Sequence, residues 1–385
     1  MTILIRQMNN PEEILSIARD FQQILSDSEE KRQRVRSWLY EKGLHSLIIA
    51  QRENFAWLST GGDAAVVNST QNCIGCLLIT RDNQYLISHV MDGKRLLEEQ
   101  LPGQNYELIE MHWYEGDPVI KALGIAGKNA VADINIPGIR NVFSEILDLH
   151  YPMKEIEMDR LCKLGQCMHS IFIEMAKKIR PGISEMDLAA EFQYLQSLKG
   201  ISSDVLIVGS DDRIFKYRHP VPTNKKIEKF ILLHSASRMW GLHAPITRLY
   251  SIGAPEKEFL NPFKSVAEIQ AKVLANIKPG IPYSQILEQM KGWYAQAGYS
   301  GEWKNHFQGG PTGYVIVDGI RCLTQKIIQT NTPFEWFITV PGSKTAELAL
   351  LGTDGLKIVS NGDLWPQFSA NVNGKEYQMP GIYII

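Results

Sequence analysis

The stretch LLHSASRMWGLHAPITRLYSIG, residues 232–253, decides the fold of this chain and is predicted to form a β-hairpin. It carries His234 and His243, and a P-I-T-R run begins at Pro245. The stretch contains no Asp or Glu. Hard divalent cations are held by carboxylate oxygens, so the hairpin lacks the residue type that such a metal site needs.

Length and composition limit the class of protein. A chain of 385 residues is too long for one ordinary core, so we expect two domains. Its 44% hydrophobic and 21% charged residues are typical of a soluble globular protein. A net charge of −2 favours neither nucleic acid nor anionic membrane as a partner. There is no apolar run of membrane-spanning length and no signal-peptide layout, so a cytoplasmic location is expected.

The five cysteines agree with a reducing compartment, because an odd number is a poor disulfide framework. Cys73 and Cys76 form an isolated C-x-x-C. This motif is open to interpretation as a redox pair or as half of a zinc site, but no second Cys/His pair has ligand spacing. A buried strand with small residues at its start is the favoured interpretation.

The first domain is predicted to span residues 1–157, with a polar, partly helical leader at 1–28. A helix is expected to start at the cap formed by Asp27 and Ser28 and to run to Gly43. Strands then interleave with helices, which indicates an α/β domain. The strands are expected at residues 46–50, 73–80 and 84–90, and the helices near 93–101 and 138–149.

The second domain, residues 158–385, contains an internal repeat. MAKKIRPGISEMDLAAEF (175–192) and VLANIKPGIPYSQILEQM (273–290) share a helix, an I-(R/K)-P-G-I turn and a second helix, 98 residues apart. Pro-Gly is typical of the end of the first helix in each copy. Strand-like segments follow both copies, at 204–209 and 230–237 and again at 313–319 and 333–340. The pattern predicts two related α-β halves.

These features resemble the pita-bread superfamily, which includes methionine aminopeptidases, prolidases, aminopeptidases P and creatinases. The hairpin, the repeat and the order of the flanking motifs carry the resemblance over about residues 30–360. The pattern R-x-R-x-W-L-x-E-K-G-L, with Asn54 and W-L-S-T-G after it, resembles the N-terminal domain of creatinases and prolidases. The resemblance implies a creatinase-like α/β domain followed by a pita-bread domain with a pseudo-two-fold repeat. It also implies a homodimer.

The peptidases of this superfamily hold two metal ions with two Asp, one His and two Glu. Aligned with the family motifs, four of these five positions fall on residues whose side chains cannot bind a metal, and one falls on a His. The residues are His234, Pro245, Gly310, Phe337 and Ala346. One imidazole does not make a metal site. The resemblance therefore implies that this chain has no dinuclear metal site, and no other cofactor is indicated.

Two other histidines match positions that the family uses apart from the metal. His219, in YRHPVPTN (217–224), falls on the His that contacts substrate in the peptidases and transfers a proton in the metal-free creatinases. His306, in HFQGGPTGY (306–314), falls on a second substrate-contacting His. A neutral imidazole takes and returns a proton near pH 7 without a metal. His219, His306 and His234 are therefore the predicted catalytic residues.

Seven further residues are candidates for substrate binding. Arg248 suits a substrate carboxylate, although a structural ion pair is the favoured alternative. The glycines of the 306–314 loop would let backbone approach a ligand. The aromatic and acidic candidates would line the site. If the alignment with the family motifs is shifted by one residue, Glu335 or Glu347 would fall on a metal-ligand position. The candidates are Arg248, Tyr217, Gly309, Gly310, Phe337, Glu335 and Glu347.

Three functions remain open at this point. The first is a metal-independent hydrolase or lyase of the creatinase type that acts on a C–N bond of a small polar, amino-acid-like metabolite. The second is a metal-dependent Xaa-Pro peptidase, and the third is a binding protein without catalysis. All three involve a small molecule or peptide rather than nucleic acid or membrane.

Overall fold

The computed structural model describes residues 11–385, with side chains from Asp20 onward. The chain divides into two compact units, Met1–Ile156 and Glu157–Ile385. The division falls beside the predicted boundary at residues 157 and 158.

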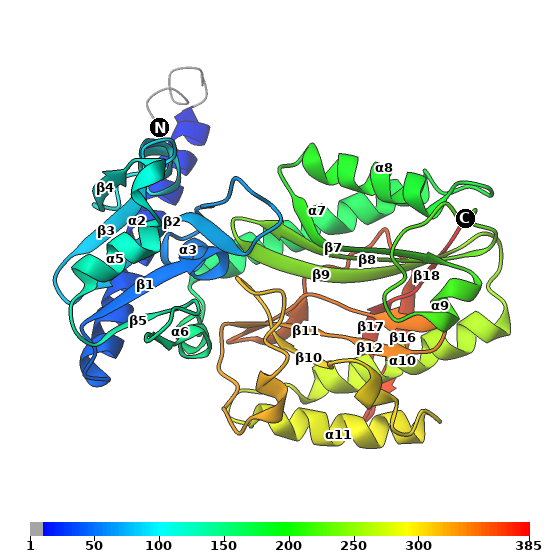
Figure 1. Cartoon of the computed structure of the whole chain (residues 1–385). Coiled ribbons are helices and arrows are strands. Elements are labelled where there is room, and N and C mark those ends of the chain that lie inside the picture. Colours follow the sequence, from blue (N-terminus) through cyan, green and yellow to red (C-terminus); the bar gives the residue numbers. More distant parts are fainter. Residues whose placement is uncertain (1–10) are drawn as a thin grey trace. The chain divides into compact units, whose positions relative to one another are not determined.

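The first unit is built on a six-stranded mixed sheet in the order β4-β3-β2-β1-β5-β6. β1 pairs antiparallel with β2 and parallel with β5, and the apolar side chains of Ile48, Leu78 and Ile87 form its core beneath α5 (Figure 1). Its elements are α2 (Pro11–Glu41), β1 (Ser46–Gln51), α3 (Arg52–Leu58), β2 (Asn72–Thr80), β3 (Gln84–His89), α4 (Gly93–Arg95), a π-helical turn (Leu96–Gln100), β4 (Glu107–Met111), a 3₁₀ turn (Trp113–Glu115), α5 (Pro118–Ala126), β5 (Ala130–Ala132), β6 (Arg140–Asn141) and α6 (Phe143–Leu149).

Two predicted helix boundaries in this unit are wrong. The helix expected to start at Asp27 and Ser28 already includes both, because α2 runs from Pro11 to Glu41. Asp27 pairs with Lys31 at 2.7 Å, one turn further along, and so does not cap a helix. The helix expected at 138–149 begins only at Phe143, after the short strand β6. The first ten residues of the predicted leader lie outside the described residues.

The second unit packs helices around two four-stranded sheets, β18-β9-β8-β7 and β10-β11-β14-β15, and two two-stranded ribbons, β12-β13 and β16-β17. Its helices are α7 (Glu155–Ala176), α8 (Glu185–Ser197), α9 (Asp212–Lys216), α10 (Lys257–Asn276) and α11 (Tyr283–Gln296), with 3₁₀ turns at Glu302–Asn305 and Arg321–Leu323. Its strands are β7 (Ser202–Ser210), β8 (Phe230–Met239), β9 (Leu242–Ser251), β10 (Gly309–Pro311), β11 (Thr332–Trp336), β12 (Ile338–Val340), β13 (Ser343–Thr345), β14 (Ala349–Gly352), β15 (Gly355–Ile358), β16 (Gln367–Val372), β17 (Lys375–Pro380) and β18 (Ile382–Ile384).

The internal repeat is confirmed by equivalent backbone hydrogen bonds at the two Pro-Gly turns. The Gly182 N–H donates to the Ile227 carbonyl at 3.0 Å, and the Gly280 N–H donates to the Ile328 carbonyl at 2.9 Å. Each turn therefore joins its two helices and is tied to a later segment in the same way. One expected strand of the second copy is absent, because residues 313–319 form an irregular segment and no strand.

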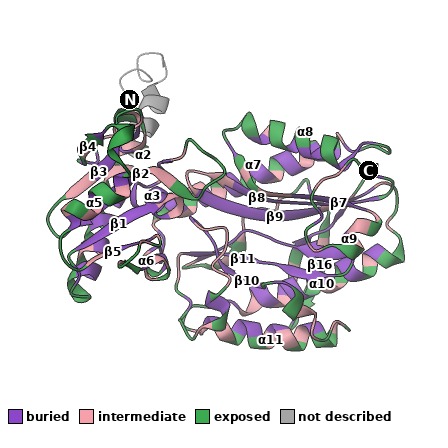
Figure 2. Ribbon diagram, in the orientation of Figure 1, coloured by how far each residue is buried: buried purple, intermediate pink, exposed green. Residues whose placement is uncertain are grey.

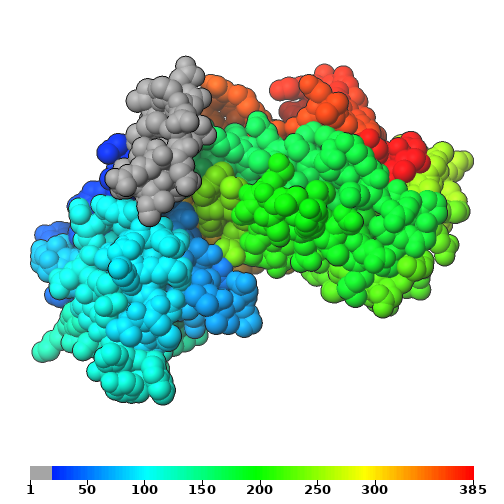
Figure 3. All heavy atoms as spheres, turned by 90° about the horizontal axis from the view of Figure 1, so that it is seen from above, coloured from blue at the N-terminus to red at the C-terminus, as the bar shows by residue number. Residues whose placement is uncertain are grey.

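The predicted hairpin is formed by β8 and β9, which pair without interruption from Phe230 opposite Ser251 to Met239 opposite Leu242. Trp240 and Gly241, at φ 54° and 73°, make the two-residue connection, whose positive φ values suit the twist of a hairpin. Both strands are largely buried beneath α7 and α8 (Figure 2). Figure 3 shows the exposed side of α8, in green, on the surface of this unit.

The predicted α/β class is confirmed by these sheets and helices. Among residues 11–385, no helix is both long and apolar enough to cross a membrane. All five cysteines are free. Cys76 is buried in β2, as the strand interpretation of the C-x-x-C predicted.

Candidate functional site

His219 and His306 lie side by side in the second unit. Their Nε2 atoms are 3.0 Å apart, and their rings meet edge to face with centroids 5.0 Å apart. His219 lies in the loop after α9, and His306 directly follows the 3₁₀ turn Glu302–Asn305. His219 is exposed and His306 is buried, so the pair extends from the protein surface inward. The structure thus brings together two predicted residues that are 87 positions apart.

The hydrogen bonds define how this pair shares its proton. The Nδ1 of His306 contacts the carbonyl oxygen of Phe307, which only accepts, so Nδ1 carries the hydrogen. In a neutral ring the Nε2 of His306 is then an acceptor, and the Nε2–H of His219 donates to it. Burial, with a smaller effect from the positive charge of Lys344, lowers the pKa of His306 to about 4. The same two causes lower the pKa of His219, so both rings are neutral at pH 7.

His234 completes a group of side chains that we call the histidine cluster: His219, His306, His234 and Phe337. His234 is buried on β8, opposite Thr247 on β9, and its Nδ1 lies 2.9 Å from the Thr247 hydroxyl. Its ring centroid is 5.8 Å from that of Phe337, which is 5.3 Å from that of His306. Burial lowers the pKa of His234 well below its ordinary value, and this ring is neutral too.

Lys344 is a residue of this site that sequence reasoning missed. It lies on β13 opposite Thr339 of β12, is 2% exposed, and places its ammonium 4.7 Å from the centroid of the Phe337 ring. Burial lowers its pKa to about 8, and the carboxyl group of Glu335 acts in the opposite direction. A Lys after Gly342-Ser343 reads as an exposed turn residue, so the sequence contains no signal of its burial.

Glu335 is fully buried on β11, opposite Gly310 of β10. Neither of its carboxyl oxygens has a hydrogen-bond partner among the described residues. Burial raises its pKa well above the ordinary value, which favours the uncharged acid. It is a polar group beside the cluster and contacts no other predicted site residue through its carboxyl oxygens.

The two predicted loop glycines serve packing between backbones. A Cβ on Gly309 would lie 2.3 Å from the Glu335 carbonyl oxygen, and one on Gly310 would lie 2.7 Å from the Asp318 carbonyl oxygen. Gly309 also has φ +113°, which side-chain-bearing residues rarely adopt. The prediction that these glycines admit a ligand is therefore corrected: they admit β11 and the neighbouring loop.

Arg248 and Glu347 form a buried ion pair and are not free to bind substrate. The Arg248 Nη1 is 2.5 Å from one Glu347 oxygen and Nη2 is 3.1 Å from the other. The Arg248 guanidinium also donates to the Ser360 and Thr247 carbonyls and lies between the rings of Phe172 and Trp365. The structural alternative for Arg248 is the one that the geometry supports, and the substrate-binding prediction for both residues is corrected.

Two other residues named from the sequence lie outside the cluster. Tyr217 is 53% exposed, with its ring beside the Arg213 guanidinium. His243 is buried and contacts the Gly313 carbonyl through Nδ1 and the Asp204 carboxylate through Nε2.

The residues present do not fit the metal pair that the fold family implies. The positions that the resemblance assigns to the metal ligands hold His234, Pro245, Gly310, Phe337 and Ala346, of which one has a side chain that binds metal. Residues 20–385 contain no group of three or more His, Cys, Asp or Glu side chains placed to hold a metal ion.

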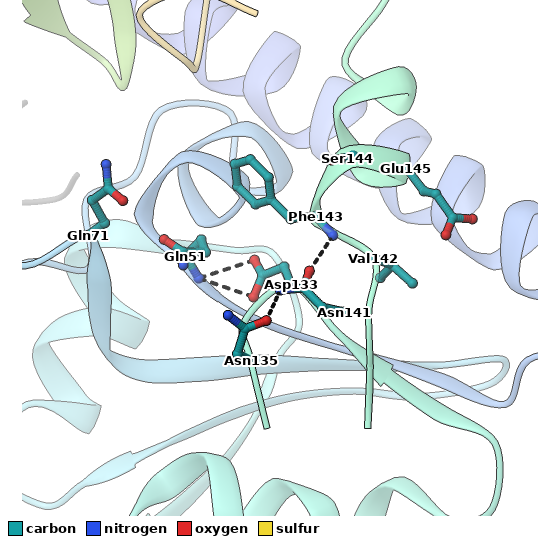
Figure 4. Close-up of a pocket in the computed structure, with 9 residues that line it drawn as sticks. All are labelled: Gln51, Gln71, Asp133, Asn135, Asn141, Val142, Phe143, Ser144 and Glu145. Atoms are coloured by element: carbon teal, nitrogen blue, oxygen red, sulfur yellow. Dashed lines mark hydrogen bonds between the residues drawn. The ribbon is translucent and has the colours of Figure 1, made fainter. Parts of the chain in front are cut away.

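The first unit has a separate cavity of about 520 Å³ (Figure 4). At its base lies Asp133, which accepts hydrogen bonds from the backbone N–H groups of Ala50 and Gln51 and from the Asn54 amide. Burial raises the pKa of Asp133 to about 6. Its partners are all within the unit, so this carboxylate stabilises the end of β1. The lining residues are Gln51, Gln71, Asp133, Asn135, Asn141, Val142, Phe143, Ser144 and Glu145.

The chain is similar in sequence to a set of dipeptidases. A model of metallopeptidase family M24 matches residues 159–333. The Xaa-Pro dipeptidase of Pyrococcus horikoshii is 22% identical over 85% of this chain and 96% of that protein. The probable dipeptidase PepE of Mycobacterium tuberculosis is 23% identical over 54% of this chain and 58% of its own length.

Solved structures give the same picture of the fold. The Xaa-Pro dipeptidase from Bacillus anthracis has a TM-score of 0.73 at 19% identity, over 93% of this chain and 100% of that chain. The prolidase from Pyrococcus horikoshii has a TM-score of 0.72 at 18% identity, over 87% of this chain and 99% of the other. The predicted pita-bread fold is confirmed. The matched proteins are named as Xaa-Pro dipeptidases, a prolidase and a probable dipeptidase, so the comparisons favour the peptidase alternative over the creatinase type.

Proposed function

We propose that this chain, a member of the pita-bread superfamily, is a hydrolase that cleaves a C–N bond of a small amino-acid-like or dipeptide-like metabolite, with His219 and His306 moving the protons. The observation that carries the proposal is the 3.0 Å contact between the Nε2 atoms of these two histidines. The names of the relatives support hydrolysis of a bond to nitrogen. The groups of the histidine cluster that can take up or release a proton are its imidazoles, and this supports acid–base chemistry by imidazole.

The tautomers assign a direction to the proton transfers. When substrate and water separate the two rings, the free Nε2 of His306 accepts a proton from the water as its oxygen bonds to the substrate carbon. The exposed His219 takes up a proton from solvent at Nδ1, so that its Nε2–H can protonate the departing nitrogen as the C–N bond breaks while the ring stays neutral. The proton on His306 Nε2 then passes to the free Nε2 of His219, whose Nδ1 returns a proton to solvent, and this restores the resting state. General acid–base catalysis of this kind contributes about 10²–10⁴-fold.

Removing either imidazole is expected to abolish most of the turnover. His219→Ala and His306→Ala should each lower kcat/KM by about 10²–10⁴-fold. Release of free amine from a panel of Xaa-Pro dipeptides and N-acyl amino acids measures this, with His112→Ala, an exposed His of the first unit, as the matched control. Full turnover in His219→Ala would overturn the proposed roles, and no turnover of any substrate by the wild type would favour a binding protein.

The second candidate is a metal-dependent Xaa-Pro dipeptidase, which the names of the relatives favour. It is separated from the first by metal content and metal response. We expect elemental analysis of purified protein to find no stoichiometric transition metal. Added Mn(II), Co(II) or Zn(II) should leave both Tm and Xaa-Pro hydrolysis unchanged, because the site offers one imidazole where two ions need carboxylates. Metal-stimulated turnover would establish the second candidate instead.

Two other predictions are part of the proposal. A homodimer follows from the resemblance of the first unit to creatinases and prolidases, and a cytoplasmic location follows from the composition. Sedimentation of the purified chain tests the first, and fractionation of its source cells tests the second.

A further inference from the structure

We propose that Lys344 makes the histidine cluster an anion-binding site whose ligand carries a carboxylate that pairs with the Lys344 ammonium. The proposal deepens the proposed function and rests on it for the place of the site. It does not require that any bond be cleaved there.

The position of Lys344 is fixed by the β12-β13 ribbon. Ser343 pairs with Val340 and Lys344 with Thr339, and the connecting Gly342 has φ +88° with Phe215 directly against it. The side chain is 2% exposed, and its ammonium lies over the Phe337 ring, whose other ring neighbours are His234, His306 and Phe307. Lys344 is therefore held at the inner side of the cluster, while His219 is at its exposed side.

Within residues 20–385, no carboxylate lies within ion-pair distance of the Lys344 ammonium, and no hydrogen bond from it is formed. Glu335 acts on the pKa of Lys344 from beyond ion-pair distance, and burial raises the pKa of Glu335 itself, which favours its uncharged form. The three histidines are neutral as well. The cluster therefore carries one positive charge without a counter-ion among the described residues.

A second buried lysine, Lys31, has a carboxylate partner, as expected for a lysine with a structural role. Lys31 is 1% exposed, and its ammonium is 2.7 Å from the Asp27 carboxylate, which also accepts a hydrogen bond from Thr60. A buried charge without such a partner costs several kcal/mol. A fold keeps such a charge where a ligand supplies the partner, and an anion at Lys344 recovers the cost on binding.

The surroundings suit a singly charged anion. Arg218, which precedes His219 in the sequence, is also positively charged. Its guanidinium forms an ion pair with Glu302 and donates a hydrogen bond to the Thr339 hydroxyl at 3.1 Å. A phosphate dianion would find one cation for two charges. A cavity of about 10 Å³ beside Lys344 is bordered by Gln270 and Thr345, whose Oε1 and Oγ1 have no hydrogen-bond partner. This cavity has room for about one water and does not include the histidines of the cluster.

Thermal unfolding of the full chain and of Lys344→Met tests the proposal. In wild type, sodium formate or acetate should raise Tm in a saturable way at ionic strength held constant with chloride. Lys344→Met should lose this rise, and its ligand-free Tm should be higher than that of wild type by at least about 2 °C, because an uncompensated buried charge is removed. Lys375→Met is the control, since Lys375 also lies over an aromatic ring, Tyr377, but is exposed.

Three outcomes would overturn the proposal. The first is a lower ligand-free Tm in Lys344→Met than in wild type, which would mean that Glu335 is the structural partner of Lys344. The second is an equal effect of carboxylates on the Tm of both proteins. The third is a rise in Tm with inorganic phosphate but not with formate or acetate. His219→Ala separates this proposal from the proposed function. If that variant keeps both the carboxylate effect and turnover, the proposed function fails and the anion site stands. If turnover depends on His219 but the carboxylate effect is absent in wild type, the anion site fails alone.

Discussion

Arg248→Met is expected to destabilise the second unit by about 3–5 kcal/mol, because Glu347 would remain buried as a charge without its partner. Arg248 is fully buried and Glu347 is 2% exposed, and the guanidinium and carboxylate meet through two hydrogen bonds. Chemical denaturation monitored by tryptophan fluorescence measures the effect. Glu347→Leu should be destabilising for the same reason.

The double variant Arg248→Met/Glu347→Leu is the sharper test. Replacing both members of a buried pair by apolar residues is often neutral or stabilising, so the double variant should be more stable than either single variant. Arg140→Ala is the matched control, because the Arg140–Glu145 pair is 2.8 Å long but exposed, and it should cost about 0–1 kcal/mol. A stable Arg248→Met that loses only substrate affinity would restore the substrate-anchoring prediction for this residue.

The second large effect is a loss of stability in acid that depends on His306. Its pKa is lowered from 6.5 to about 4 in the folded protein, so the unfolded chain binds the proton more tightly. Stability from this group is present above pH 6.5 and is lost as the pH falls toward 4. At 1.36 kcal/mol per pKa unit, the loss is about 3 kcal/mol.

Other groups titrate in the same range with the opposite sign. Burial raises the pKa of Glu335 and that of Asp133, so each favours the folded state as the pH falls. The measurement is therefore the difference between wild type and His306→Gln, which has a neutral side chain at every pH. Urea unfolding at pH 7 and at pH 4.5 should show wild type losing about 2–3 kcal/mol relative to the variant. Parallel pH profiles would show that His306 keeps its ordinary pKa.

Much of the fold could be predicted from local residue patterns. The Pro-Gly turns at 181–182 and 279–280 predicted the repeat because Pro and Gly restrict the backbone locally. The hairpin was predictable for a similar reason, since its strands are adjacent in sequence. Helix α2 was placed too late because the polar pair Asp27 and Ser28 looks like a cap, whereas Asp27 instead pairs with Lys31 inside the helix.

The site was predictable only in part. His219 and His306 were identified from family motifs, and the structure brings them into contact, yet their tautomers depend on a carbonyl at Phe307. Arg248 and Glu347 are 99 positions apart, so their mutual pairing left no local mark. Lys344 was missed because its burial comes from the way the β12-β13 ribbon packs under Phe337.

The family resemblance pointed to His219 and His306, whereas the sequence by itself determined the α/β class, the two related halves and the hairpin without acidic residues. These follow from turn residues, hydrophobic pattern and motif spacing, which act over short stretches of chain. Only the tertiary structure decided which charges are neutralised. Arg248 and Lys31 have buried counter-ions, while Lys344 has none among the described residues. Neutralisation depends on the distance between groups far apart in the sequence, and folding alone sets that distance.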